Sequence, residues 1–322
     1  MDRNIEILIL TNRIFPMEDK SRELIENTAT GAVITVVNGV EATAEMFKKA
    51  EVIFGWPEEE QLKRSVNLRW LHLPSAGADS YARWELYPNS NILLTNSSGV
   101  YGVPIAEHVL AMILAYNHNL WKYAEQQKNL KWEEIRRTRD FYGSTIGIIG
   151  MGDIGMELAK RSKALGARVL GVKRTRSSMP EYVDRLYTIE EIDEVLQQAD
   201  YVVLALPNTQ KTNGIVSEQR LRKMKPDAFL VNIGRGALVD QEALIKALKE
   251  NLIGGVGLDV TEPEPLPQDN PLWELPNVMI TPHVSGISPS NDRIRIDLFV
   301  KNLERYLTGE PLVNMVDFEE GY

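Results

Sequence analysis

The chain has 322 residues, and with domains of about 150 residues we expect two of them. Apolar residues make up 43% and charged residues 25%, which excludes a disordered or fibrous chain. The net charge of −9 disfavours binding to nucleic acid or to an anionic membrane, and zero cysteines with only four histidines leave little material for a metal centre. No apolar run approaches the about 18 residues of a membrane span, so we expect a cytoplasmic protein that acts on small molecules.

The first ninety-odd residues alternate short β-branched runs with helical stretches, which predicts a parallel α/β unit. A long helix is predicted from Pro104 to about Tyr123, because proline suits a first helical turn and apolar residues follow at helical spacing. A second alternation begins at Gly143. Its six β-rich runs predict a doubly wound sheet of six strands, with a helix that ends at Gly254 and Gly255 and a closing helix after Pro289.

The segment GMGDIG matches the fingerprint of a dinucleotide-binding loop. One glycine makes a tight turn, the next lets a pyrophosphate approach the backbone, and the last permits close helix packing. The segment follows the apolar run TIGII and precedes the helical MELAKRSKAL, which is the context that separates this motif from an ordinary glycine turn. We therefore expect cofactor contacts from Gly150, Gly152, Asp153, Ile154 and Gly155.

The second strand of such a domain ends in an acidic residue when the cofactor is NAD, about 20 residues beyond the fingerprint. Here that place holds Lys173, followed by Arg174, Thr175 and Arg176. Cations and a hydroxyl suit the 2′-phosphate of NADP(H), which we expect to be preferred, with NAD(H) possible. The alternative is a solvated basic loop without a cofactor role.

Three charged residues follow successive late strands of the second alternation: Arg235, Glu264 and His283. The carboxyl ends of parallel strands share one edge of a sheet, so these side chains can meet near a cofactor. Taken singly, each of them could equally be an ordinary loop or surface residue.

With their flanking segments, these residues resemble the D-isomer-specific 2-hydroxyacid dehydrogenases, and the resemblance covers nearly the whole chain. It rests on SSGVYGVPIAEH, LPNTQKTNGI, NIGRGALVDQEAL, GLDVTEPEPLP and NPLWELPNVMITPHVSG, which occur in the family's order. The resemblance implies an α/β fold of two domains, with a Rossmann-type doubly wound parallel sheet inserted into a flavodoxin-like substrate domain. The substrate domain would comprise residues 1–98 and 288–322, and the dinucleotide-binding domain residues 99–287. It also implies a homodimer built largely through the cofactor domain.

The resemblance assigns Arg235 to the carboxylate and carbonyl of the substrate, His283 to proton transfer and Glu264 to orienting His283. The loop LPSAGAD looks like the family's carboxylate-binding turn, with backbone amides near Ala76 and Gly77. Trp56 resembles a pocket tryptophan of glyoxylate and hydroxypyruvate reductases, and Tyr101 would help to shape the same pocket. Further cofactor contacts are expected from the later motifs: Pro207, Thr212, Ile233, Arg235, Asp259, His283 and Gly286.

The sequence thus favours an oxidoreductase that reduces a small 2-keto acid to a D-2-hydroxy acid, with His283 as general acid and base. The alternative from another class is a cofactor-sensing binding protein like the C-terminal-binding corepressors, which an extra recognition segment or a long disordered tail would favour. Formate and phosphite dehydrogenases are weaker rivals. The sequence does not name the keto acid, because one methylene or hydroxyl changes selectivity by only a few kcal/mol.

Overall fold

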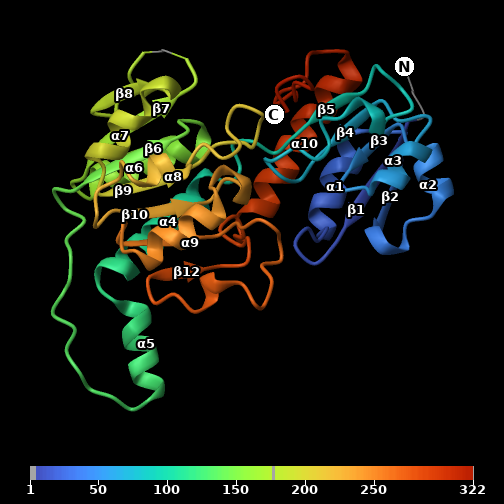
Figure 1. Cartoon of the computed structure of the whole chain (residues 1–322). Helices are drawn as coiled ribbons and strands as arrows, with labels where there is room; N and C mark the ends of the chain where they lie inside the picture. The colour runs from blue at the N-terminus through green and yellow to red at the C-terminus, as the bar shows by residue number, and fades with distance from the viewer. Residues whose placement is uncertain (1–4, 176–177, 322) are drawn as a thin grey trace. The chain divides into compact units, whose positions relative to one another are not determined.

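The computed structural model describes residues 5–175 and 178–321, which form two compact units (Figure 1). Unit 1 comprises Met1–Val100 and Ile287–Tyr322, and unit 2 comprises Tyr101–Gly286. Both units are built on parallel sheets with helices, so the predicted α/β class is confirmed. The sequence placed the two crossings after residues 98 and 287.

Unit 1 holds a five-stranded parallel sheet in the order β2-β1-β3-β4-β5, the order of flavodoxin-like sheets. Its elements are β1 (Glu6–Thr11), α1 (Asp19–Thr28), β2 (Val33–Asn38), α2 (Ala44–Lys49), β3 (Val52–Phe54), α3 (Glu59–Arg64), β4 (Trp70–His72), β5 (Leu93–Thr95) and α10 (Asn291–Thr308).

The closing helix α10 completes this unit because its apolar face packs on the sheet together with α1. Phe299 stacks on Phe54 at 4.3 Å between ring centroids and on Trp70 at 5.2 Å. On the opposite face, Phe47 of α2 and Leu62 of α3 are buried against alternate strand residues. The segment from residue 287 onward is therefore part of the core of unit 1.

Unit 2 holds a seven-stranded parallel sheet in the order β12-β11-β10-β9-β6-β7-β8. From β6 the chain adds strands toward one side of the sheet up to β8 and then returns to add β9 to β12 on the other side, so the strand order reverses between β6 and β9. Ligands of such sheets bind at that point, beyond the carboxyl ends of the strands. The elements are α4 (Gly102–Asn117), α5 (Leu120–Lys128), β6 (Thr145–Ile149), α6 (Asp153–Ala164), β7 (Arg168–Lys173), β8 (Arg185–Thr188), α7 (Ile192–Gln198), β9 (Tyr201–Leu204), α8 (Glu218–Leu221), β10 (Phe229–Asn232), α9 (Gln241–Lys249), β11 (Gly255–Leu258) and β12 (Val278–Ile280).

The central strands β9, β10 and β11 are buried at every position because both faces of the sheet are covered. In β9, Tyr201 and Val203 point to the core beneath α4 and α6, whereas Val202 and Leu204 point to the core beneath α7 and α9. Successive side chains of a strand point to opposite faces of the sheet, so one apolar run contributes to both cores.

The sequence expectations failed for two helix ends and one strand in unit 2. The predicted helix from Pro104 ends at Asn117, since Asn119 takes a left-handed conformation with φ 53° before α5 begins. The seventh strand, β8, was not predicted, because it is a short edge strand. The helix expected to end at Gly254 and Gly255 ends at Lys249, and Gly255 opens β11 instead.

Helix α5 and the segment that follows it extend away from the sheet of unit 2 (Figure 1). The hydroxyl of Tyr123 accepts the N–H of Ile135 at 2.9 Å, which holds the returning segment against α5. Two large apolar residues of this arm, residues 118–140, are almost fully exposed: Leu130 at 94% and Trp132 at 102%. Among the described residues, no helix is both long and apolar enough to cross a membrane.

His72 ends β4 inside the aromatic core of unit 1 and is completely buried. Its Nδ1 lies 2.6 Å from Thr95 Oγ1, which also accepts the indole N–H of Trp70 at 2.8 Å. Burial lowers the pKa of His72 from 6.5 to about 3, so the folded unit holds the ring neutral.

Because the folded pKa of His72 lies below the unfolded value, its contribution to stability is complete above pH 6.5 and is lost as pH falls toward 3. Between pH 8 and pH 5, wild type should lose about 2 kcal/mol more unfolding free energy than His72→Leu. Urea unfolding at both pH values measures this difference. His118→Leu, at an exposed position, is the control and should behave like wild type. Equal losses in wild type and His72→Leu would refute the role of this buried ring.

Candidate functional site

The glycine loop after β6 is shaped by contacts that leave no room for side chains. A Cβ on Gly150, whose φ is 111°, would collide with the carbonyl of Ala205, and a Cβ on Gly155 would collide with the carbonyl of Gly150. At Gly152, in contrast, a Cβ would meet nothing within 4 Å. The loop is therefore tight where helix and strand pack and open at the N-terminus of α6, as a pyrophosphate site requires.

Asp153 and Ile154 form the first turn of α6. The Asp153 carboxylate accepts the backbone N–H of Gly102 at the start of α4, and burial raises the pKa of this carboxyl above its usual value. A Cβ on Gly102 would lie 2.7 Å from the Asp153 carboxylate. This contact joins the beginnings of α4 and α6 beside the glycine loop.

The neighbouring strand β7 ends at Lys173, which is half-buried, and Arg174 and Thr175 follow on the surface. The carbonyl of Val172 accepts the N–H of Gly150 at 3.0 Å, so this strand end lies next to the glycine loop. Arg176 lies outside the described residues. The end of β7 thus presents a lysine and an arginine where an NAD enzyme of this fold has a carboxylate.

The loop after β9 is held in place by its own polar groups. The hydroxyl of Thr212 donates to the carbonyl of Pro207 at 2.7 Å and accepts the N–H of Thr209 at 2.8 Å. Within the part of the chain that the structure describes, the side-chain oxygen of Asn208 is buried without a hydrogen-bond partner. A buried acceptor in a prearranged loop suits an N–H or O–H group of a ligand. Sequence reasoning did not single out Asn208, whose only signal is its place between Pro207 and Thr212.

Arg235 follows β10 and Ile233, on extended backbone at the same edge of the sheet. Its carbonyl accepts the side-chain N–H of Asn232 at 2.8 Å, and one of its guanidinium nitrogens donates to the carbonyl of Gly234 at 2.8 Å. A Cβ on Gly236 would collide with the backbone of Thr261. The loops after β10 and β11 are therefore packed against each other.

Glu264 and His283 meet directly. Nδ1 of His283 lies 2.9 Å from one carboxylate oxygen of Glu264, and the other oxygen accepts the N–H of Thr261 at 3.1 Å. Both side chains are about half exposed, at 52% for His283 and 40% for Glu264. Since an ionised carboxylate only accepts hydrogen bonds, Nδ1 carries a proton in this pair.

Asp259 directly follows β11 and fixes the backbone around His283. Its carboxylate accepts the N–H groups of Val284 at 2.9 Å and Ser285 at 3.0 Å, and the hydroxyl of Thr281 at 2.6 Å. Burial alone would raise the pKa of Asp259, but these hydrogen bonds outweigh burial and lower it. The carboxylate is thus ionised, and its hydrogen bonds hold residues 281–285, the His283 turn.

Three predicted substrate contacts lie in unit 1, around the turn that follows β4. The indole N–H of Trp56 donates to Ser75 Oγ at 3.0 Å, and that hydroxyl donates to the carbonyl of Gly77 at 2.9 Å. The side-chain amide of Asn96 donates to the carbonyl of Ala76 at 2.8 Å. Ser75, which the sequence did not single out, therefore connects Trp56 to the turn.

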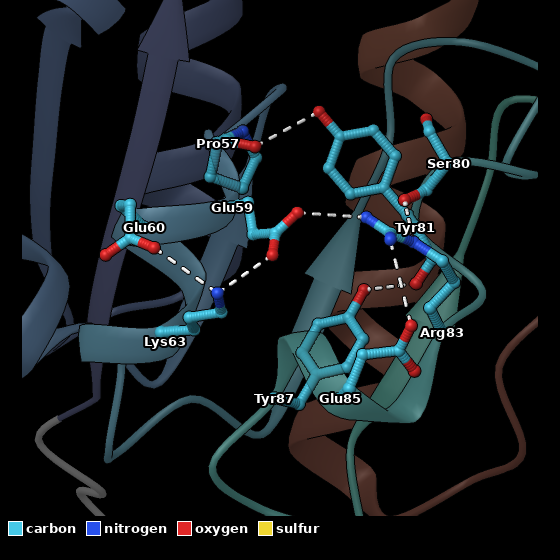
Figure 2. A network of polar contacts seen from close by, with 9 residues as sticks. All are labelled: Pro57, Glu59, Glu60, Lys63, Ser80, Tyr81, Arg83, Glu85 and Tyr87. Carbon is cyan, nitrogen blue, oxygen red and sulfur yellow. Dashed lines mark hydrogen bonds and ion pairs between the residues drawn. The ribbon is translucent and has the colours of Figure 1, made fainter.

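Figure 2 shows how the next segment of unit 1 supports this arrangement. The hydroxyl of Tyr81 donates to the carbonyl of Pro57 at 3.2 Å, and the hydroxyl of Tyr87 donates to the carbonyl of Tyr81 at 2.7 Å. Arg83 and Glu59 add an exposed ion pair at 3.2 Å. Burial raises the pKa of Tyr81 to about 12, so its hydroxyl stays protonated as a donor. The loop with Trp56 is tied to residues 80–87.

Tyr101 and Gly286 lie together at the ends of unit 2. A Cβ on Gly286 would lie 3.1 Å from the ring of Tyr101, so glycine permits this close packing. The geometry therefore joins Glu264 to His283, places the Arg235 loop beside them, and leaves Tyr101 in unit 2 and Trp56 in unit 1.

The sequence model of the protein family "D-isomer specific 2-hydroxyacid dehydrogenase, NAD binding domain" matches residues 110–285, more than half of the chain. The chain belongs to this family. Its glycine cradle, the buried acceptor of Asn208 and the cationic end of β7 fit a nicotinamide dinucleotide, the cofactor that this domain binds.

Similar proteins agree with this membership. A glyoxylate reductase from Thermococcus onnurineus is 42% identical over 237 residues, which are 71% of this chain and 70% of the relative. The structure of a D-isomer specific 2-hydroxyacid dehydrogenase family protein from Aeromonas salmonicida is 30% identical, with a TM-score of 0.87, and the match covers 98% of this chain and all of the other. A 2-hydroxyacid dehydrogenase from Xanthobacter autotrophicus, solved with NADPH and MES, is 26% identical, with a TM-score of 0.84 and coverage of 99% and 100%.

Gly152→Ala separates cofactor binding from folding. The new methyl group has open space, and the φ of −84° suits alanine, so the Tm should stay within about two degrees of wild type. The same methyl group should obstruct a pyrophosphate and weaken the binding of NADPH and NADH by about tenfold or more, or about 1.4 kcal/mol. Fluorescence titration measures this affinity. Gly39→Ala in unit 1 is the control, and unchanged affinity in Gly152→Ala would show that the cofactor does not approach there.

Proposed function

We propose that this protein is a reductase of small 2-keto acids that yields D-2-hydroxy acids and prefers NADPH. The observation that carries the proposal is the Glu264–His283 hydrogen bond. It lies at the carboxyl-terminal edge of the parallel sheet of unit 2, where the Arg235 loop and the glycine loop also lie. Family membership supports the reaction class, and names of relatives such as glyoxylate reductase support the size of the substrate.

In the proposed reaction, the bound nicotinamide supplies the hydride that reduces the keto carbon. Arg235 binds the carboxylate and the carbonyl oxygen of the keto acid through its planar fork. Protonated His283 donates the proton of Nε2 to the oxygen on which negative charge develops. Glu264 holds Nδ1 in its protonated form and stabilises the positive ring. In unit 1, Trp56 and the turn at Ala76 and Gly77 are the proposed substrate contacts.

Arg235→Lys tests the proposed grip on the substrate. A compact ammonium does not reproduce the two parallel hydrogen bonds of a guanidinium, so kcat/KM for keto acid reduction should fall by about a hundredfold or more, or about 2.7 kcal/mol. Binding of NADPH should persist. Arg293→Lys, at an exposed position on α10, is the control and should be fully active. Near-normal reduction by Arg235→Lys would assign the substrate carboxylate to another group.

The preference for NADPH is proposed from Lys173 and Arg174 at the end of β7, and the NADPH found in the Xanthobacter autotrophicus relative is consistent with it. Replacing both residues with alanine should raise the KM for NADPH by about tenfold or more and change the KM for NADH much less, because only NADPH carries the extra phosphate. Alanines at Lys160 and Lys249 remove the same two charges elsewhere in unit 2 and serve as the control. An equal loss for both cofactors would contradict the proposed phosphate site.

We also propose that the protein is a homodimer and that the arm contacts the second copy. Leu130 and Trp132 are almost fully exposed on a segment that α5 holds away from the sheet, and such apolar side chains are commonly covered in assemblies. Light scattering after size exclusion should give a dimer for wild type and a shift toward monomer for Trp132→Glu. Lys131→Glu changes charge on the same arm and is the control. A monomeric wild type would overturn this proposal.

A further inference from the structure

His108 of α4 contacts residues that lie far from it in the sequence. Its Nε2 is 3.1 Å from Thr281 Oγ1, after β12, and 3.9 Å from a carboxylate oxygen of Asp259, after β11. The His108 side chain is 23% exposed, and the Asp259 side chain is 0% exposed. Helix α4, which lies apart from the loops that follow the strands, thus contacts the turn that carries His283.

The direction of each hydrogen bond in this series follows from the groups present. An ionised carboxylate only accepts hydrogen bonds, so the hydroxyl of Thr281 donates its single hydrogen bond to Asp259 at 2.6 Å. The hydroxyl oxygen of Thr281 can then only accept from His108, whose Nε2 must carry a hydrogen. The series runs from His108 through Thr281 to Asp259.

At the far end of the series, the backbone of the catalytic turn is held by the same aspartate. The N–H groups of Val284 and Ser285 donate to its carboxylate, and the N–H of His283 donates to its carbonyl at 2.8 Å. His283 has φ 53°, a conformation that is uncommon for a residue other than glycine. Such a conformation persists only where the surrounding contacts fix it.

We propose that His108 is a positioning residue that, through Thr281 and Asp259, holds the His283 turn in its left-handed conformation. Polar groups in series strengthen one another when the network is buried and complete. Loss of the first donor releases the Thr281 hydroxyl to turn away from Asp259, and the His283 turn then loses part of its support. This inference rests on the proposed function, because it concerns the residue proposed to transfer the proton.

The test compares three variants in keto acid reduction with NADPH. His108→Leu removes the donor, His108→Gln restores an N–H at similar reach, and Thr281→Val removes the hydroxyl while keeping the shape of the side chain. We expect kcat to fall about tenfold to a hundredfold in Thr281→Val, the loss typical of a hydrogen bond to a charged group, here Asp259. In His108→Leu, which acts through the same bond, kcat should fall by a similar factor. The dissociation constant of NADPH should stay unchanged, and His108→Gln should recover most of the wild-type kcat.

The double variant His108→Leu/Thr281→Val distinguishes a series from two independent effects. If the two residues act in one series, the double variant should lose no more than the worse single variant. His118→Gln, which changes an exposed histidine just past the end of the same helix, is the control and should match wild type. Should His108→Leu fail to fold, Thr281→Val and the His108→Gln rescue still decide the proposal.

A readout without turnover uses the small number of histidines. The chain has four, so the imidazole signals of ¹⁵N-histidine-labelled protein can be assigned by replacing each in turn. The His283 signal should move in His108→Leu and in Thr281→Val, and it should stay in place in His108→Gln. An unmoved signal, full activity of His108→Leu, no rescue by glutamine, or multiplying losses would each overturn the proposal.

The proposed function and the proposed positioning role of His108 can be tested separately. If wild type reduces no 2-keto acid, the proposed function falls, while the His283 signal still tests whether His108 holds the turn. Suppose that wild type reduces a keto acid and that His283→Asn abolishes that activity. If His108→Leu then changes neither the His283 imidazole signal nor kcat, only the positioning role of His108 is refuted.

Discussion

Parallel pairing of every strand in unit 2 is the constraint on which the site depends. Residues of β6 pair with β9, those of β9 with β10, and those of β10 with β11, all in the same direction. The loops that leave these strands therefore meet at one edge. The glycine loop, the Asn208 loop, the Arg235 loop and the Glu264 loop are brought together by this register, although about 110 residues separate the first of them from the last in the sequence.

A second level of order comes from buried polar groups at that edge. The Asp259 carboxylate receives three donors from residues 281–285, and burial makes its correct pairing obligatory, because an unpaired charge there would be costly. His283 and Glu264 lie at the surface side of the same turn, about half exposed. The buried aspartate thus supports a pair of side chains that stays accessible to solvent.

Much of this could be predicted from the sequence, where motifs are local. The GMGDIG segment gave the glycine loop because its tight contacts need glycine at Gly150 and Gly155, and the order of strands placed Arg235, Glu264 and His283 at one edge. Long-range contacts were not predictable. The contact between His108 and Thr281 is one of these, since the two residues lie 173 positions apart in the sequence. The break in the helix at Asn119 depends on a left-handed residue that apolar spacing does not reveal.

The most direct test of the account is a double-mutant cycle on the proposed catalytic pair. The kcat for reduction of the best substrate from a panel of 2-keto acids is measured with NADPH for wild type, Glu264→Gln, His283→Asn and the double variant. Because Glu264 is proposed to act only through His283, the double variant should be no slower than His283→Asn alone. Losses that multiply, or a His283→Asn variant that keeps wild-type activity, would contradict the account.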